Sequence, residues 1–184
     1  MNPAFSVVIF TTIAGAAQGL VVALAFAWLA GVPMAAGFVG RSLILAVAML
    51  LVGLGASFGH LGRPERAWRA AMMWRTSWLS REVIVLPAFI GICALWWLAL
   101  RAGLETPLLP LAAILFAALL WYCTAMIYAC LRFIQEWAQP LTLVNFMLIG
   151  LSSGLVLASA LAALAGQTAL LQVTGPSAVL VTLA

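Results

Sequence analysis

The sequence of 184 residues is 67% hydrophobic and only 7% charged, with a net charge of +4. A soluble domain carries roughly 25% charged residues, so this composition excludes an ordinary water-soluble fold. Several apolar runs are long enough to cross a bilayer, and none shows the short polar–apolar alternation of a transmembrane β-barrel. All eight basic residues are arginines, many of them close to tryptophan or to the end of an apolar run. This pattern is typical of a membrane interface rather than of nucleic-acid binding, and we predict an all-α fold, a polytopic transmembrane helix bundle.

The apolar runs predict five full spans and the start of a sixth. The five cover about residues 7–30, 43–59, 82–100, 110–131 and 143–165. The first run lacks a basic start and contains polar residues such as Gln18, so we expect a span rather than a cleaved signal peptide. A last run after Thr174-Gly175-Pro176 is too short to cross. Residues 1–184 are therefore expected to form a single integral-membrane domain.

Glycines recur at four-residue spacing in three of the spans. Such a face lets another helix approach closely, because no side chain separates the two backbones. The three pairs are Gly15 and Gly19, Gly55 and Gly59, and Gly150 and Gly154.

The polar connection at residues 61–81 concentrates the charged groups of the chain. Pro64 suits the first turn of a short helix, and the residues after it predict an amphipathic segment in the headgroup plane. This segment is either an interfacial anchor or a docking surface. Ser80 is the predicted N-cap of the third span, which puts Glu82 in the first turn of that helix. Pro87 is a predicted kink.

The arginines are distributed unequally between the two sides of the membrane. Because the spans alternate in direction, the second-to-third and fourth-to-fifth connections share a side with the N-terminus. That side collects Arg63, Arg66, Arg69, Arg75, Arg81 and Arg132, whereas the loops on the other side hold Arg41 and Arg101. The positive-inside rule predicts that the arginine-rich side and the N-terminus are cytoplasmic.

Five polar residues are expected to gather on the arginine-rich side, where the second and fourth spans end and the third and fifth begin. They are His60, Glu82, Tyr128, Arg132 and Asn145. Thr124, Tyr128 and Arg132 are four residues apart and form one stripe. An unperturbed histidine titrates near pH ~6.5, so a histidine and a carboxylate at this depth can pass protons. Ionisable groups in a membrane are by default a functional hypothesis.

Each of these residues also has a structural interpretation. His60 can be a helix-end residue that binds a backbone carbonyl. Glu82 can form an ion pair with Arg81 or Arg75, and Tyr128 can be a packing residue.

Two other classes of protein stay open. A proton or small-solute transporter would show polar residues at mid-membrane, a description that only Gln18, Thr124 and Ser152-Ser153 approach. A purely structural anchor would need neither His60 nor Glu82 for activity.

The chain offers few ligands for a redox cofactor. A bis-histidine haem needs two histidines, and the chain has one. Cys93, Cys123 and Cys130 lie inside apolar segments without C-x-x-C spacing, whereas an iron–sulfur cluster needs about four thiolates. We expect no haem or metal in this chain.

Two stretches resemble the signatures of a known family. HLGRPERAWRAAMMWRTSWLSREV begins at His60, and MIYACLRFIQEWAQPLTLVNF begins at Met126. They are similar, in order and distance, to the two signatures of the dimethyl sulfoxide reductase anchor-subunit family. The resemblance covers about residues 7–165. Because members of that family have an eight-helix fold, the chain resembles its N-terminal part.

The resemblance implies a non-catalytic membrane anchor for a molybdopterin catalytic subunit and an iron–sulfur electron-transfer subunit. Such anchors work in anaerobic electron transport in the inner (cytoplasmic) membrane of bacteria. They bind quinol or menaquinol and hold no redox cofactor of their own. The family's quinol-site histidine and glutamate match His60 and Glu82.

We expect quinol oxidation between His60 and Glu82, which accept the two protons while the electrons pass to the iron–sulfur subunit. Further quinol-binding candidates at the same depth are Tyr128, Arg132 and Asn145. The partner is expected to dock on the arginines of the connection, Arg63, Arg66, Arg69 and Arg75. Related anchors of sulfite-oxidising enzymes would run the same site towards quinone reduction.

Overall fold

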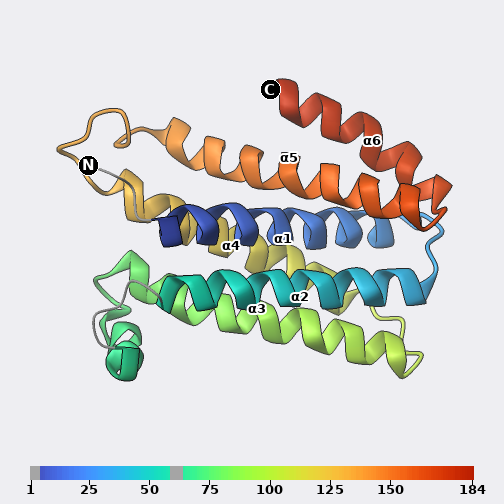
Figure 1. Ribbon diagram of the computed structural model, residues 1–184, viewed down its shortest axis with the longest axis horizontal. Coiled ribbons are helices and arrows are strands. Elements are labelled where there is room, and N and C mark those ends of the chain that lie inside the picture. Colours follow the sequence, from blue (N-terminus) through green and yellow to red (C-terminus); the bar gives the residue numbers. More distant parts are fainter. Residues whose placement is uncertain (1–4, 59–63) are drawn as a thin grey trace.

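The chain forms six α-helices and one short 3₁₀ helix over the residues that the computed structural model describes, 5–58 and 64–184 (Figure 1). They are α1 (Phe5–Leu29), α2 (Ala36–Phe58), η1 (Pro64–Met73), α3 (Trp78–Arg101), α4 (Leu108–Ala129), α5 (Pro140–Leu164) and α6 (Thr168–Leu183). Helices α1 to α5 are each long and apolar enough to cross a membrane, and α6, with 16 residues, is shorter. This confirms the all-α bundle with five full spans and a partial sixth.

Helix α1 lies at the centre of the bundle, and the helices alternate in direction (Figure 1). It packs against α2, α4 and α5, while α3 packs on α4 and α6 packs on α5. Its middle is buried without a break from Ala17 to Ala25. The alternation brings η1, the start of α3 and the α4–α5 connection to one end of the bundle, on the left in Figure 1. η1 is the short helix predicted at Pro64, in the 3₁₀ form.

Helices α1 and α5 touch through their backbones at Gly19 and Gly154. A methyl group on Gly154 would collide with backbone atoms of Gly19 and Leu20, and one on Gly19 would lie 2.9 Å from the Gly154 Cα. Only glycine allows this approach, which confirms the contacts predicted for the first and third glycine pairs. The second pair has the same spacing, but a methyl group on Gly55 would meet nothing within 4 Å, so none of the described helices packs closely there. Gly59 lies outside the described residues.

Helix α2 begins at Ala36 and not at residue 43, so Arg41 lies inside a helix and not in a loop. The Arg41 Nε donates a hydrogen bond of 3.2 Å to the Gly37 carbonyl one turn earlier. Trp97 of α3 packs on Gly40, 3.3 Å from where a methyl group would stand. Gly37 and Gly40 have low helix propensity, so the sequence placed the start of the helix too late. In the structure, the packing of α3 on this turn outweighs that propensity.

Helix α6 also begins before the predicted run, at Thr168, and continues through Gly175 and Pro176. The Ser159 Oγ on α5 donates a hydrogen bond of 2.9 Å to Thr174 Oγ1 on α6. Packing on α5 therefore carries the helix across a Gly-Pro pair that the sequence suggested as a break. Proline is tolerated in such helices because neighbours satisfy the freed backbone groups.

The N-cap of α3 is Ser77, not the predicted Ser80. Ser77 has an extended backbone, and its Oγ accepts a hydrogen bond of 3.3 Å from the Ser80 backbone N–H. The helix starts earlier than predicted, at Trp78, so Glu82 lies beyond its first turn and gains little from the helix dipole. Pro87 lies inside α3.

Candidate functional site

Glu82 is a carboxylic acid buried inside an apolar helix bundle. Its side chain is 5% exposed, and the Thr124 hydroxyl on α4 donates a hydrogen bond to its Oε1. Burying a carboxylate without partners is costly, so this hydroxyl is part of what allows the residue to stay there. The contact also ties α3 to α4 at the arginine-rich end of the bundle.

The predicted alternative, an ion pair from Glu82 to Arg81 or Arg75, is wrong. Arg81 instead donates to the backbone carbonyls of Trp74 at 2.9 Å and Arg75 at 3.0 Å. Its guanidinium also stacks 4.0 Å from the centre of the Trp78 ring. Arg81 therefore fastens the end of the connection to the start of α3 and leaves the Glu82 carboxyl to Thr124.

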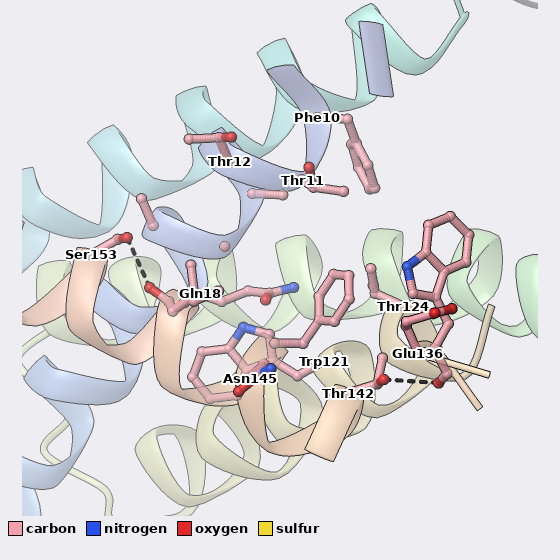
Figure 2. Close-up of a pocket in the computed structure, with 17 residues that line it drawn as sticks. Phe10, Thr11, Thr12, Gln18, Trp121, Thr124, Glu136, Thr142, Asn145 and Ser153 are labelled. Carbon is pink, nitrogen blue, oxygen red and sulfur yellow. Dashed lines mark hydrogen bonds between the residues drawn. The ribbon is translucent and has the colours of Figure 1, made fainter. Parts of the chain in front are cut away.

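Thr124 joins Glu82 to a cavity. Its side chain lines a space of about 410 Å³ between α1, α4, α5 and the α4–α5 connection (Figure 2). Its Oγ1 lies 3.0 Å from the Leu120 carbonyl as well as in contact with Glu82. A hydroxyl has one proton to donate and two lone pairs, so Thr124 can also accept a hydrogen bond from the cavity side.

The wall of this cavity combines apolar surface with several polar side chains. Its polar side chains are Thr11, Thr12, Gln18, Trp121, Thr124, Glu136, Thr142, Asn145 and Ser153. Phe10, Phe146 and Ile149 supply apolar wall between them. Figure 2 shows Thr142 and Glu136 at the end of the cavity nearest the α4–α5 connection, and Gln18 deeper along α1.

The structure brings together only part of the predicted five-residue cluster. Asn145 lines the cavity. Tyr128 does not line it, and its ring stacks on Phe146 at 5.2 Å and meets Trp137 edge-on at 5.3 Å. Those two rings do line the cavity, so Tyr128 supports its wall from behind. His60 lies outside the described residues.

Arg132 departs from the predicted stripe. The stripe was expected to run from Thr124 through Tyr128 to Arg132, but α4 ends at Ala129. Arg132 follows in the α4–α5 connection and is exposed. The span was predicted to run to residue 131. Because α4 ends earlier, Arg132 does not continue the helical repeat of Thr124 and Tyr128.

Trp121 was missed by the sequence analysis. Gln18 and Thr124 were noted, Thr124 as part of a stripe with Tyr128 and both under the transporter alternative, but neither was proposed as a quinol-site residue. Gln18 is 3% exposed and Trp121 is 5% exposed. A single glutamine or threonine in an apolar run is a usable signal, because such groups are expensive in a membrane. A tryptophan gives no such signal, because its large apolar ring suits any buried position.

These features define a multi-pass membrane protein with a cavity between α1, α4 and α5 that lies beside a buried carboxyl group. The chain belongs to the DMSO reductase anchor subunit (DmsC) family, whose family model matches residues 1–184. The family predicted from the two signatures is thus confirmed. Anchors of this family associate with the catalytic and electron-transfer subunits of molybdoenzyme complexes.

Two relatives show how much of the family's length the chain spans. It is 46% identical to a sulfite dehydrogenase subunit of Allochromatium vinosum over 202 residues, which is 100% of this chain and 62% of that protein. It is 29% identical to the anaerobic dimethyl sulfoxide reductase chain YnfH of Escherichia coli over 158 residues, which is 84% of this chain and 56% of that protein. The chain therefore spans less than two thirds of the length of either relative. No solved structure matches it.

Proposed function

We propose that this chain is the quinone-binding part of a membrane anchor that exchanges electrons between quinol and an iron–sulfur partner subunit. The observation that carries the proposal is the buried Glu82 carboxyl, whose hydrogen-bonding partner Thr124 also lines the cavity. A buried base beside a cavity is what quinol chemistry needs, because the quinol must lose protons where water is scarce. Membership of the anchor-subunit family supports the same assignment.

Quinol oxidation breaks two O–H bonds and releases two protons and two electrons. In this proposal Glu82 accepts one proton and His60 accepts the other. The two electrons pass one at a time to an iron–sulfur cluster of the partner subunit, which delivers them to the molybdopterin subunit. The chain's own task is to hold the head group and move the protons.

The opposite direction is a second candidate, and one observation favours it. The relative that shares 46% identity over this whole chain is named as a subunit of a sulfite dehydrogenase. In that direction electrons leave a sulfite-oxidising catalytic subunit, and the anchor passes them to a quinone that takes up two protons. Each proton step at Glu82 and His60 is reversible, so the same site serves both directions.

We assign partner docking to the arginine-rich end of the bundle. Arg69 and Arg75 are exposed there, and their guanidinium groups lie 5.5 Å and 5.4 Å from the rings of Trp68 and Trp74. Arg63 and Arg66 belong to the same proposal, because they lie a few residues before Arg69 in the sequence. Charges at an interface rim mainly affect the association rate and its salt dependence.

Arg69→Gln with Arg75→Gln should therefore make the complex dissociate at lower salt than the parent complex. The matched control is Arg101→Gln, an exposed arginine at the other end of the bundle. If the two variants resist salt equally, the connection arginines serve as membrane anchors and not in partner docking.

We place the arginine-rich end on the cytoplasmic side of a bacterial inner membrane, with the N-terminus on the same side. A cysteine at Ala70 should then resist a membrane-impermeant thiol reagent in intact cells and react after the cells are opened. Rapid labelling of Ala70→Cys in intact cells would reverse the orientation.

The decisive test of the function is Glu82→Gln in the complete complex. This change keeps the shape and hydrogen bonding of the side chain but removes the base. Quinol-dependent turnover should fall by roughly 100-fold or more. His60→Arg, which adds bulk and a fixed charge, should be at least as damaging.

Turnover with a soluble electron carrier that reacts directly with the partner subunits should be unchanged in both variants. Glu105→Gln is the matched control, since Glu105 is an exposed carboxylate outside the cavity. Full quinol turnover in Glu82→Gln would make the chain a structural anchor. Loss of the soluble-carrier activity as well would make Glu82 a folding residue.

A further inference from the structure

We infer that the cavity between α1, α4 and α5 holds the quinone head group, with the Trp121 indole N–H donating a hydrogen bond to one of its oxygens. Gln18 supplies the second polar contact from α1, and Thr124 relays a proton to Glu82. The inference rests on the proposed function and deepens it, because it assigns the binding position within the bundle.

The first observation is an unsatisfied donor. Trp121 is 5% exposed, and its Nε1 has no hydrogen-bond acceptor among the described residues. It is the one buried side-chain nitrogen or oxygen in that part of the chain without such a partner. A buried N–H without an acceptor is destabilising, and each such group calls for an explanation. Trp121 lines the cavity beside Gly150, so the cavity is where an acceptor for this N–H would enter.

The position of this donor is fixed by packing. The indole edge of Trp121 lies against Gly150 of α5, where a methyl group would come within 2.6 Å of Nε1. Gly150 therefore leaves the ring just enough space and prevents it from moving towards α5. An indole held this way is preorganised to bind, because little of its motion is lost when the acceptor arrives.

Gln18 adds a donor and an acceptor on the other wall. It is 3% exposed on α1 and lines the same cavity (Figure 2). In Figure 2 no hydrogen bond joins its amide to another of the residues drawn. An amide can donate to a quinone carbonyl and accept from a quinol hydroxyl, so Gln18 suits both redox states.

The size and the apolar walls of the cavity suit a flat aromatic ring. Its volume of about 410 Å³ falls within the ~300–1,000 Å³ of typical small-molecule sites. Phe10 and Phe146 line it, and aromatic side chains pack favourably against a flat ring. The cavity thus combines aromatic surface with a few polar groups, which is the composition that binds a quinone.

Thr124 completes a path for the proton. Its hydroxyl donates to Glu82 Oε1 and faces the cavity with free lone-pair capacity. A quinol hydroxyl that donates to Thr124 Oγ1 can pass its proton there while the Thr124 proton moves to Glu82. The O–H bond of the quinol breaks, Thr124 is regenerated as a hydroxyl, and Glu82 ends protonated. One electron leaves with this proton to the iron–sulfur cluster of the partner. The second proton and the second electron follow as set out in the proposed function.

The test measures equilibrium binding of menadione, a bare naphthoquinone head group, to the purified complete complex. Trp121→Phe keeps most of the ring and removes the N–H, and Gln18→Met keeps the length of the side chain and removes the amide. Each should weaken menadione binding roughly three- to tenfold, the loss expected for one hydrogen bond. Trp96→Phe is the matched control, because Trp96 is 1% exposed and does not line the cavity. It should bind menadione like the parent.

A second readout separates a hydrogen bond from a packing effect. In menadione labelled with ¹³C at its carbonyl groups, the infrared stretch of one carbonyl should move to higher frequency in Trp121→Phe and not in Trp96→Phe. If Trp121→Phe fails to assemble, Gln18→Met decides the question.

Parent-like affinity in both cavity variants, together with loss of quinol turnover in Glu82→Gln, would move the head group out of the cavity. That result would overturn this inference and leave the proposed function intact. Parent-like behaviour in all three variants would overturn both.

Discussion

The interface between α1 and α5 is closed in one region and open in the next. At Gly19 and Gly154 the two backbones touch, and a single methyl group would force them apart. Nearer the start of α1, Thr11 and Asn145 line opposite walls of the cavity. Gly150 stands at the boundary, because it contacts α1 on one side and the Trp121 indole of α4 on the other.

The comparison teaches that glycine serves two different purposes on one helix face. In the closed region it removes side chains so that backbones can pack, which is the usual basis of association between membrane helices. At the boundary it makes room for the ring of a third helix. The cavity forms because α4 and its Trp121 ring lie between α1 and α5 here and keep the two helices apart.

The largest effect is expected from breaking the closed region with Gly154→Leu. The new side chain would collide with backbone atoms of Gly19 and Leu20, and backbone cannot move aside as a side chain can. The free energy of unfolding should fall by about 3 kcal/mol or more, with little folded protein left in the membrane.

The amount of folded complex recovered from the membrane and the thermal unfolding of that complex measure this, with Gly91→Leu as the control. A methyl group on Gly91 in α3 would meet nothing within 4 Å among the described residues. Similar losses in both variants would show that helix propensity matters here and the α1–α5 contact does not.

A smaller effect is expected from Thr124→Val, which leaves the open region in place and cuts its link to Glu82. Valine matches the shape of threonine without the hydroxyl, so the cavity should persist while quinol-dependent turnover falls about tenfold, the cost of one hydrogen bond in the rate-limiting state. Thr124→Ser should restore the rate. Turnover with a soluble electron carrier should not change. If quinol-dependent turnover of the Thr124→Val complex equals that of the parent, Thr124 does not link the cavity to Glu82.

The smallest effect is expected from Gly55→Ala, because this glycine has the spacing of a contact face and a methyl group there would meet none of the described residues. Alanine has the better helix propensity, so stability should stay within about 1 kcal/mol of the parent, with any change towards greater stability. A destabilisation comparable to that of Gly154→Leu would mean that a further helix covers Gly55.

The closed region could be predicted from the sequence, and the open one could not. Glycine spacing is a local pattern, so Gly15, Gly19, Gly150 and Gly154 were visible without knowing which helices meet. The cavity needs three helices to be placed together, and no pattern along the chain says that the ring of Trp121 faces Gly150.

The same distinction applies to the candidate site. Glu82 and Asn145 could be placed at one end of the bundle, because alternation of the spans requires it. Arg132 could not be placed correctly, since its position depends on the exact end of α4, and helix ends are the least certain feature of a sequence. The partner of Glu82 was also out of reach. The sequence suggested Arg81 or Arg75, and no pattern along the chain says that Thr124 of α4 faces this carboxyl group.

The most direct measurement of the central claim is photolabelling of the complete complex with an azido-quinone, followed by mass spectrometry of the labelled peptides. We expect label on the walls of the open region, within residues 10–18 of α1 and 142–153 of α5, and excess menadione should prevent it. Label around Arg41 and Arg101, at the opposite end of the bundle, would contradict the account.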